Sequence, residues 1–225
     1  MNRVIALGLV ALVGLAGSAD AQIRRQQAVQ GPPANWISVG IGAFSANSVS
    51  DGESQTTWDF GNATSPQYRA SLERAFSNGL SVGLAGTYVK APLRHVTFTG
   101  LARDAEVNVY SLGVNFEAGG GSGFHQVYGA SIGMTRYDGF EATSDGAELP
   151  PTEAVNAISG NFSYGFGYAF NPRTSIVGVY DIGLVYHSRD GLSSDQRNTL
   201  VPRTLRISLR QGFGNRSRTP VRRRR

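Results

Sequence analysis

The feature that most constrains this chain is a series of segments in which every second residue is apolar. In residues 106–117, for example, Tyr110, Leu112, Val114 and Phe116 alternate with small or polar residues. Such alternation is the period of a β-strand, whose side chains point to opposite faces in turn. Each segment therefore predicts a strand with one apolar face and one small or polar face.

The pattern predicts eight strands, at residues 36–44, 67–76, 80–89, 106–117, 124–137, 156–170, 175–187 and 203–213. A barrel in lipid has its apolar face outside and a polar interior, whereas a soluble ligand-binding barrel has the reverse arrangement. Because the second face is small or polar almost throughout, it cannot fill a dry core. The pattern therefore favours a barrel in lipid, with the soluble barrel as an alternative.

The connections alternate strictly between short and long. Short ones are expected at 77–79, which holds the hairpin dipeptide Asn78-Gly79, and at 118–123 and 171–174. Long, polar ones are expected at 45–66, 90–105, 138–155 and 188–202. Outer-membrane barrels have short periplasmic turns and long external loops. The sequence therefore predicts an all-β fold, an eight-stranded antiparallel up-and-down transmembrane β-barrel at residues 35–214.

Residues 1–21 have the features of an export signal. Arg3 precedes an apolar stretch at Val4–Leu15, and Ala19 and Ala21 place small residues before a cleavage point. The stretch is short for a membrane-spanning helix, so an uncleaved anchor is the lesser alternative. We expect Sec-type export, cleavage near Ala21, an N-terminal extension at 22–34 and residence in the cell outer membrane. The chain has no cysteine, which excludes disulfides, thiolate metal sites and a lipid-modified cysteine.

The formal net charge of +5 arises from the last residues of the chain. Without them and the signal the chain is nearly neutral, which gives no reason to expect a nucleic-acid partner. We expect the basic segment to be a periplasmic tail that cannot form a core, and that either contacts anionic headgroups or cell-wall polymer or is inert. The basic tail comprises Arg216, Arg218, Arg222, Arg223, Arg224 and Arg225.

Aromatic residues are expected where a barrel meets the two surfaces of the bilayer. Tyr68, Tyr88 and Tyr186 lie near the long connections. Arg74 also has outward parity, which we explain by a side chain that extends to the interface or by a β-bulge. The expected periplasmic girdle, beside the short turns and the chain end, is Phe76, Phe116, Phe124, Phe170 and Phe213.

The charged residues with inward parity form the candidate lumen network. Eight strands enclose an interior that side chains roughly fill, and buried charges require partners. We therefore expect these residues to pair and plug the lumen, with Asp181 on a strand next to both strand-eight arginines; a gated pore or proton-linked path is the alternative. The network is Arg69, Glu73, Asp181, Arg206 and Arg210.

No catalytic, cofactor or metal residues are predicted. His95 and His125 are expected at opposite ends of the barrel, and His187 points to the opposite side from the adjacent Ser188. No phosphate loop, zinc motif or EF-hand loop is present. We expect a structural or surface-interaction role without catalysis, with a small pore for ions or solutes and a soluble ligand-binding barrel as alternatives.

The layout of strands, turns, loops and phenylalanine-ended strands resembles the small outer-membrane barrels of the OmpA-like, OmpX-like and opacity type. The resemblance covers Trp36–Phe213 and is architectural. It implies two partners, outer-membrane lipid and the barrel-insertion machinery, which reads a terminal aromatic residue. Phe213 has that position, followed here by residues 214–225.

Overall fold

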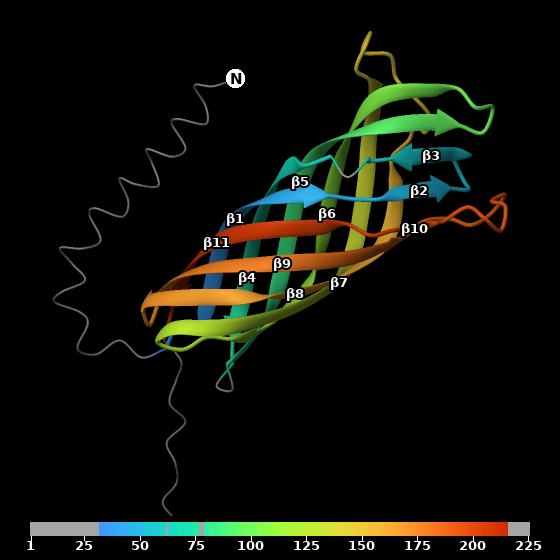
Figure 1. The fold of residues 1–225 in the computed structure, drawn as a ribbon. Coiled ribbons are helices and arrows are strands. Elements are labelled where there is room, and N and C mark those ends of the chain that lie inside the picture. Colours follow the sequence, from blue (N-terminus) through green and yellow to red (C-terminus); the bar gives the residue numbers. More distant parts are fainter. Residues whose placement is uncertain (1–31, 62, 77–78, 216–225) are drawn as a thin grey trace, which may run out of the picture. The chain divides into compact units, whose positions relative to one another are not determined.

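A computed structural model of the chain describes residues 32–61, 63–76 and 79–215, which form a closed antiparallel β-barrel (Figure 1). The expected signal at 1–21, most of the extension at 22–34 and the tail arginines lie outside the described residues. The described part of the chain contains no helix that meets the length and hydropathy of a membrane span.

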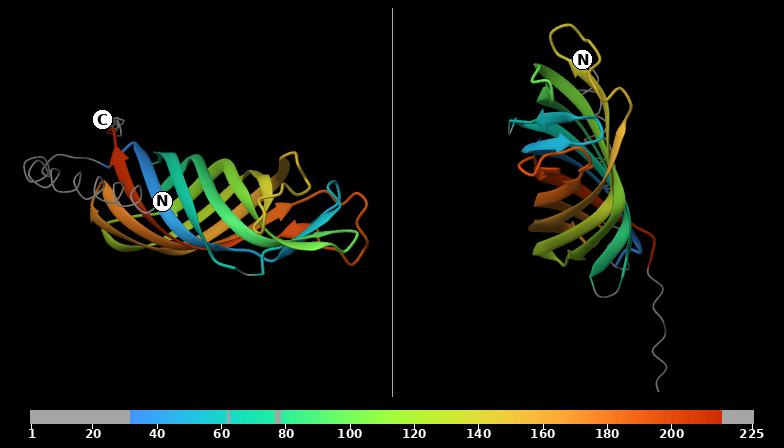
Figure 2. Two further views of the ribbon diagram at one scale, coloured as in Figure 1. Left: turned by 90° about the horizontal axis from the view of Figure 1, so that it is seen from above. Right: turned by 90° about the vertical axis from the view of Figure 1, so that its right-hand side faces the viewer.

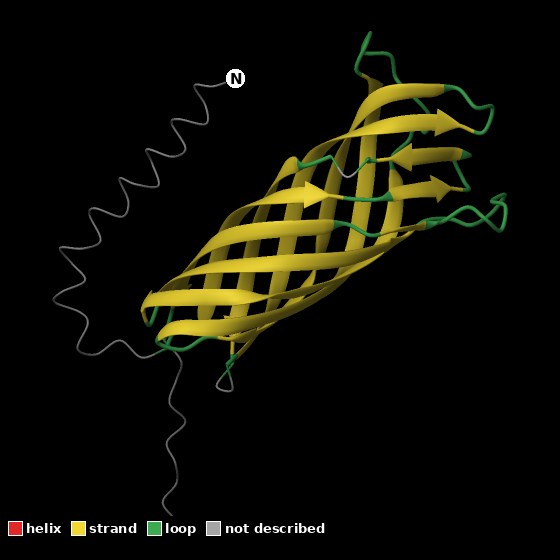
Figure 3. Cartoon of the chain, in the orientation of Figure 1, coloured by secondary structure: helices red, strands yellow, loops and turns green. Residues whose placement is uncertain are grey.

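Long strands form the wall of the barrel, and each pairs with the strands before and after it in the chain. The first of them closes the barrel by pairing with the last, with Asn35 opposite Phe213. The expected eight-stranded barrel is therefore confirmed (Figure 3). The wall consists of β1 (Asn35–Ser45), β4 (Ser65–Ala75), β5 (Leu80–Thr97), β6 (Ala102–Gly119), β7 (Gly123–Ala142), β8 (Val155–Asn171), β9 (Thr174–Tyr186) and β11 (Arg203–Phe213). The short strands β2 (Ser48–Asp51), β3 (Thr56–Asp59) and β10 (Thr199–Leu200) lie in the first and last long connections.

The alternation of the sequence becomes the two faces of this wall. In β8, Phe162, Tyr164 and Phe166 are exposed on the outside, while Ser159 is buried inside. Arg74 is exposed on the outer face, and β4 pairs with both of its neighbours without a shift in register there. A bulge therefore does not explain Arg74, whereas a long side chain that extends from near the turn to the interface does.

The prediction of a long connection at 90–105 is wrong. β5 and β6 remain paired as far as Val96 opposite Ala102, so only residues 98–101 turn. Residues 90–97 also alternate, but the apolar and polar faces are exchanged. Lys90 and Arg94 are exposed outside, whereas Ala91 and Leu93 are buried inside. An exchange of this kind is what a strand requires when it passes from lipid into water, because its outer face must then be polar.

The expected connections at 45–66, 138–155 and 188–202 also contain strand. β7 continues to Ala142, and β3 pairs with the far end of β5. The loop ends of the barrel thus project beyond the wall (Figure 2). We call the barrel from the short turns up to Tyr68, Tyr88 and Tyr110 the membrane zone, and the remainder, with β2, β3 and β10, the outer zone.

The outer zone has an apolar interior, which corrects the expectation that the inner face is small or polar almost throughout. The apolar cluster inside it, which we call the cap, includes Phe44, Val49, Trp58, Phe60, Val89, Leu93, Val107, Val109, Tyr137, Phe140, Leu149, Val185 and Leu200. The membrane zone therefore has the pattern of a barrel in lipid, and the outer zone has the pattern of a soluble barrel.

One position depends on glycine because two strands approach closely inside the wall. A Cβ at Gly133 would overlap the carbonyl oxygen of Leu112 and the Cα of Gly113 across the β6–β7 pair. Gly178 faces outward, and a Cβ there meets nothing. We predict that Gly133→Val abolishes the folded, heat-modifiable band on a gel, while Gly178→Val retains it. A normal folded band for Gly133→Val would contradict the close approach.

Candidate functional site: a lumen closed at both ends

The turn end of the lumen is filled by ion pairs centred on Glu73. Arg210 of β11 donates to Glu73 of β4 at 3.1 Å and also pairs with Glu117 of β6. The Glu73 carboxylate accepts further hydrogen bonds from Ser71 at 2.9 Å and Ser81 at 2.6 Å. These groups come from β4, β5, β6 and β11, and their inward-facing side chains meet inside the barrel. The buried charges are thereby paired, as burial requires.

A second ion pair joins β11 to its neighbour β9. Arg206 of β11 donates to Asp181 of β9 at 3.0 and 3.3 Å, and Ser163 of β8 also donates to Asp181. Arg69 donates to Asn115 at 2.8 Å, and Asn115 in turn donates to Glu73 at 3.0 Å. Arg69 of β4 is thereby connected through Asn115 of β6 to the Glu73 carboxylate.

The structure places all five expected network residues inside the barrel, but not in the expected pairs. Of the two strand-eight arginines, only Arg206 bonds to Asp181, while Arg210 bonds to Glu73 and Glu117. Sequence reasoning missed Glu117 and Asn115. The signal is present in the sequence, because Val114 and Phe116 have outward parity and their neighbours therefore face inward.

The lumen also has apolar contacts at the turn end. The Trp36 ring lies 4.8 Å from the guanidinium carbon of Arg210, in cation–π contact. Val127, Val177 and Val179 form a small buried cluster on the inner face of β7 and β9. Together with the ion pairs, these side chains occupy the barrel at the turn end.

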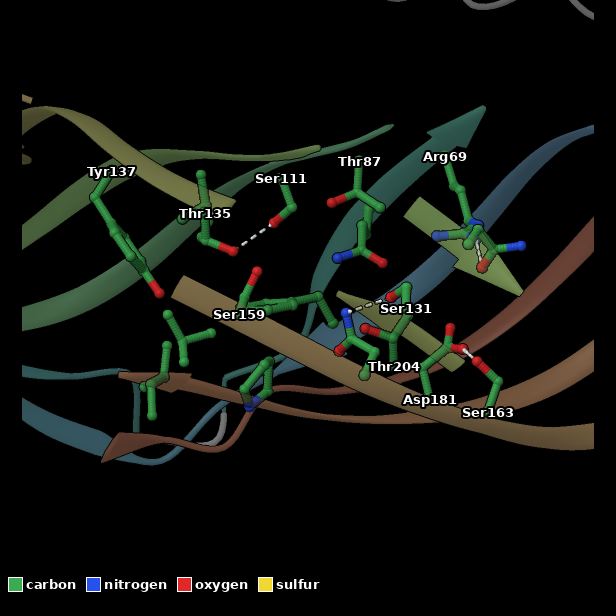
Figure 4. Close-up of a pocket in the computed structure, with 18 residues that line it drawn as sticks. Arg69, Thr87, Ser111, Ser131, Thr135, Tyr137, Ser159, Ser163, Asp181 and Thr204 are labelled. Carbon is green, nitrogen blue, oxygen red and sulfur yellow. Dashed lines mark hydrogen bonds between the residues drawn. The ribbon is translucent and has the colours of Figure 1, made fainter. Parts of the chain in front are cut away.

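Between the ion pairs and the cap lies a polar cavity of about 50 Å³. Figure 4 shows Arg69 and Asp181 at one end of it, Tyr137 at the other, and serine and threonine hydroxyls between them. A cavity of this size holds a few water molecules, and hydroxyl groups are suitable partners for them. The site fits trapped water better than an organic ligand.

Aromatic rings of the cap close the lumen on the outer side. Trp58 and Tyr137 are both 0% exposed. The Trp58 ring centroid lies 5.1 Å from that of Tyr137 and 4.7 Å from that of Phe140. The Trp58 indole donates to the Thr56 hydroxyl at 2.8 Å, which satisfies its polar group. A side chain from the β2–β3 hairpin thus fills the mouth of the barrel.

The three histidines do not converge. His95 and His187 are buried in the outer zone, while His125 lies beside the short turn at 119–123. His187 faces Trp58, Tyr137 and Asp51. The described residues contain no group of three or more histidine or carboxylate side chains arranged to hold a metal ion.

The surface residues singled out from the sequence lie on the outer face. Phe76, Phe116, Phe124, Phe170 and Phe213 are all exposed and outward-facing near the short turns or the end of β11. The Tyr88 and Tyr110 rings pair across β5 and β6, with centroids 5.1 Å apart, where the outer face changes from apolar to charged. Aromatic rings thus mark both edges of the apolar band.

No family model matches the sequence, and no curated protein matches it. Among solved structures, Neisserial surface protein A matches with a TM-score of 0.56 and 15% identity, over 82% of this chain and 100% of that one. OprG from Pseudomonas aeruginosa matches with a TM-score of 0.44 and 12% identity, over 83% of this chain and 97% of that one. The first likeness confirms the fold that the sequence resemblance implied, that of a small outer-membrane barrel.

Proposed function

We propose that this protein is an integral outer-membrane barrel whose role is surface interaction through its outer zone, rather than transport or catalysis. The proposal includes outer-membrane lipid and the barrel-insertion machinery as partners. It also includes contact of the tail arginines, which lie outside the described residues, with anionic headgroups or cell wall.

The observation that carries the proposal is the filled lumen. Paired charges occupy the turn end and the cap occupies the loop end, with a cavity for a few water molecules between them. A pore for ions or solutes needs a continuous wet path, which this interior interrupts at both ends. The outer surface of the projecting loops is then what the protein offers to other molecules.

A second observation supports a location for the proposed contact. Phe98 and Leu101, in the β5–β6 turn, are 41% and 57% exposed. The other large exposed apolar residues of the described chain belong to the outer face of the membrane zone or its edges, where lipid covers them. We infer that these two apolar side chains, held in water on a projecting turn, form part of the contact surface.

The test is adhesion by cells that express the full chain. Cells carrying the wild-type protein are expected to aggregate, or to adhere to surfaces coated with mucin or collagen, more than cells without it. Phe98→Ser with Leu101→Ser should remove the gain, while the matched control Thr97→Ser with Thr99→Ser, on the same turn, should retain it. Equal adhesion with and without the protein, together with steady channel conductance, would replace this proposal with the pore.

A further inference from the structure

His187 lies on the seam that joins the β2–β3 hairpin to the last long connection. Its backbone N–H donates to Asn198 at 2.9 Å, and the Asn198 side-chain amide donates back to the His187 carbonyl at 2.9 Å. Across the seam, the N–H groups of Ser50 and Gly52 donate to the carbonyls of Arg197 and Ser188, at 2.7 and 3.0 Å. His187 therefore lies where the cap is fastened to the barrel.

The His187 ring is buried without a hydrogen bond on either nitrogen. Its Nδ1 is 3.8 Å from Oδ1 of Asp51, the residue between Ser50 and Gly52, and that oxygen is also buried without a hydrogen-bond partner. The other Asp51 oxygen accepts from the Ser54 backbone at 2.8 Å and the Ser54 hydroxyl at 2.6 Å. Tyr137 of β7 and Trp58 of β3 cover the ring, with centroids 5.1 Å away.

From this geometry we propose that His187 is an acid-sensitive latch. In neutral medium the uncharged ring fastens the β2–β3 hairpin over the lumen. In mildly acidic medium, protonation places a cation in the apolar cap, and the hairpin, with Trp58, is released into water. This inference concerns control of the outer zone and does not depend on which partner the loops contact.

The groups that face the ring determine the direction of the effect. Burial lowers the pKa of His187, the Asp51 carboxylate offsets this only in part, and the pKa falls to about 4. Burial raises the pKa of the Tyr137 phenol, so that group stays neutral and cannot offset the charge. The neighbouring charged residues of the last connection, Arg189 and Asp190, are exposed to solvent.

In the released state the pKa of His187 has its ordinary value, whereas in the fastened state it is lowered. The stability of the fastened state relative to the released state is therefore greatest above about pH 6.5 and decreases progressively as the pH falls toward about 4. When the pH is lowered from 7.5 to 5, the population of the released state should rise about 30-fold, because His187 binds a proton more strongly in the released state.

His95 provides a comparison within the same zone. Its Nε2 lies 2.5 Å from the Pro150 carbonyl, and burial lowers its pKa while this bond raises it. The carbonyl accepts a hydrogen bond whether the ring is neutral or charged. His95 is therefore expected to respond to acid less than His187.

The test is amide hydrogen exchange of the full chain in lipid nanodiscs at pH 7.5 and pH 5, after correction for the intrinsic exchange rates. Protection of the β2–β3 amides is expected to fall about 30-fold in acid, while amides of β8 in the membrane zone stay protected. His187→Gln, which cannot be protonated, should show the same protection at both pH values. The control His125→Gln should respond as the wild type does.

Wild-type protein with unchanged β2–β3 protection at pH 5 would overturn the proposal, even if the His187→Gln chain does not fold. A pH response that survives in folded His187→Gln would also overturn it, and would assign acid sensitivity to another group. Release of both zones together would show acid unfolding of the whole barrel instead of a latch.

Discussion

Glu73→Gln is expected to lower the free energy of unfolding by about 3–5 kcal/mol, because removing one carboxylate from a buried ion-pair network leaves its arginine charge incompletely compensated. Arg210 would retain Glu117 as a partner but lose the central acceptor of the network. Ser71, Ser81 and Asn115 also donate to this carboxylate, so the loss extends across three further hydrogen bonds.

The measurement is urea unfolding of the barrel in lipid vesicles, followed by tryptophan fluorescence and gel mobility. Glu106→Gln is the matched control, because the Lys90–Glu106 pair at 2.6 Å has side chains 49% and 41% exposed. An exposed pair contributes about 0–1 kcal/mol. If the two variants lose equal stability, the charges at the turn end are open to water and the closed lumen is wrong.

Trp58→Ala is expected to cost the outer zone about 3–5 kcal/mol, the usual range for deleting a fully buried large aromatic residue. The indole fills the centre of the cap against Tyr137, Phe140 and His187. The membrane zone is held by its own strand pairing and ion pairs, so we expect the outer zone to unfold locally while the rest persists.

Limited proteolysis of the reconstituted protein measures this effect. The variant should be cut rapidly within 48–60, while a heat-modifiable fragment that contains the membrane zone survives. Phe98→Ala, which removes an exposed ring of the same zone, should be cut at the wild-type rate. Loss of the heat-modifiable fragment along with the loops would show that the two zones fold as a single unit.

The strands of the membrane zone could be predicted because lipid imposes one rule on all of them. Every second residue must be apolar, and the three tight turns mark where the chain reverses. The start of β5 at Leu80 and the end of β11 at Phe213 match the expected positions, and the other strand ends beside the short turns differ by one or two residues. Such boundaries follow from periodicity and turn chemistry alone.

The outer zone could not be predicted by the same rule, since the faces exchange where the chain leaves the lipid. Lys90 and Arg94 interrupt the apolar outer face, which suggested a loop, although Ala91, Leu93 and His95 continue the alternation on the inner face. Strands β2 and β3 are too short to show a period. Their position depends on contacts with β5 and with the last connection, which are distant in sequence.

Part of the lumen network could be predicted, namely which side chains point inward. Which carboxylate meets which arginine could not, because that depends on the stagger between strands when the barrel closes. Glu117 illustrates this: it lies on β6, yet it pairs with Arg210 of β11 across the lumen. Neighbouring strands alone would not have brought the two together.

The measurement that tests the closed lumen most directly is single-channel recording of the full chain in planar lipid bilayers at neutral pH. A barrel filled by ion pairs at one end and by the cap at the other should insert, as shown by heat-modifiable protein recovered from the bilayer lipid, and pass no steady current. Resolved openings of uniform size, in proportion to the inserted protein, would contradict the account and establish the protein as a pore.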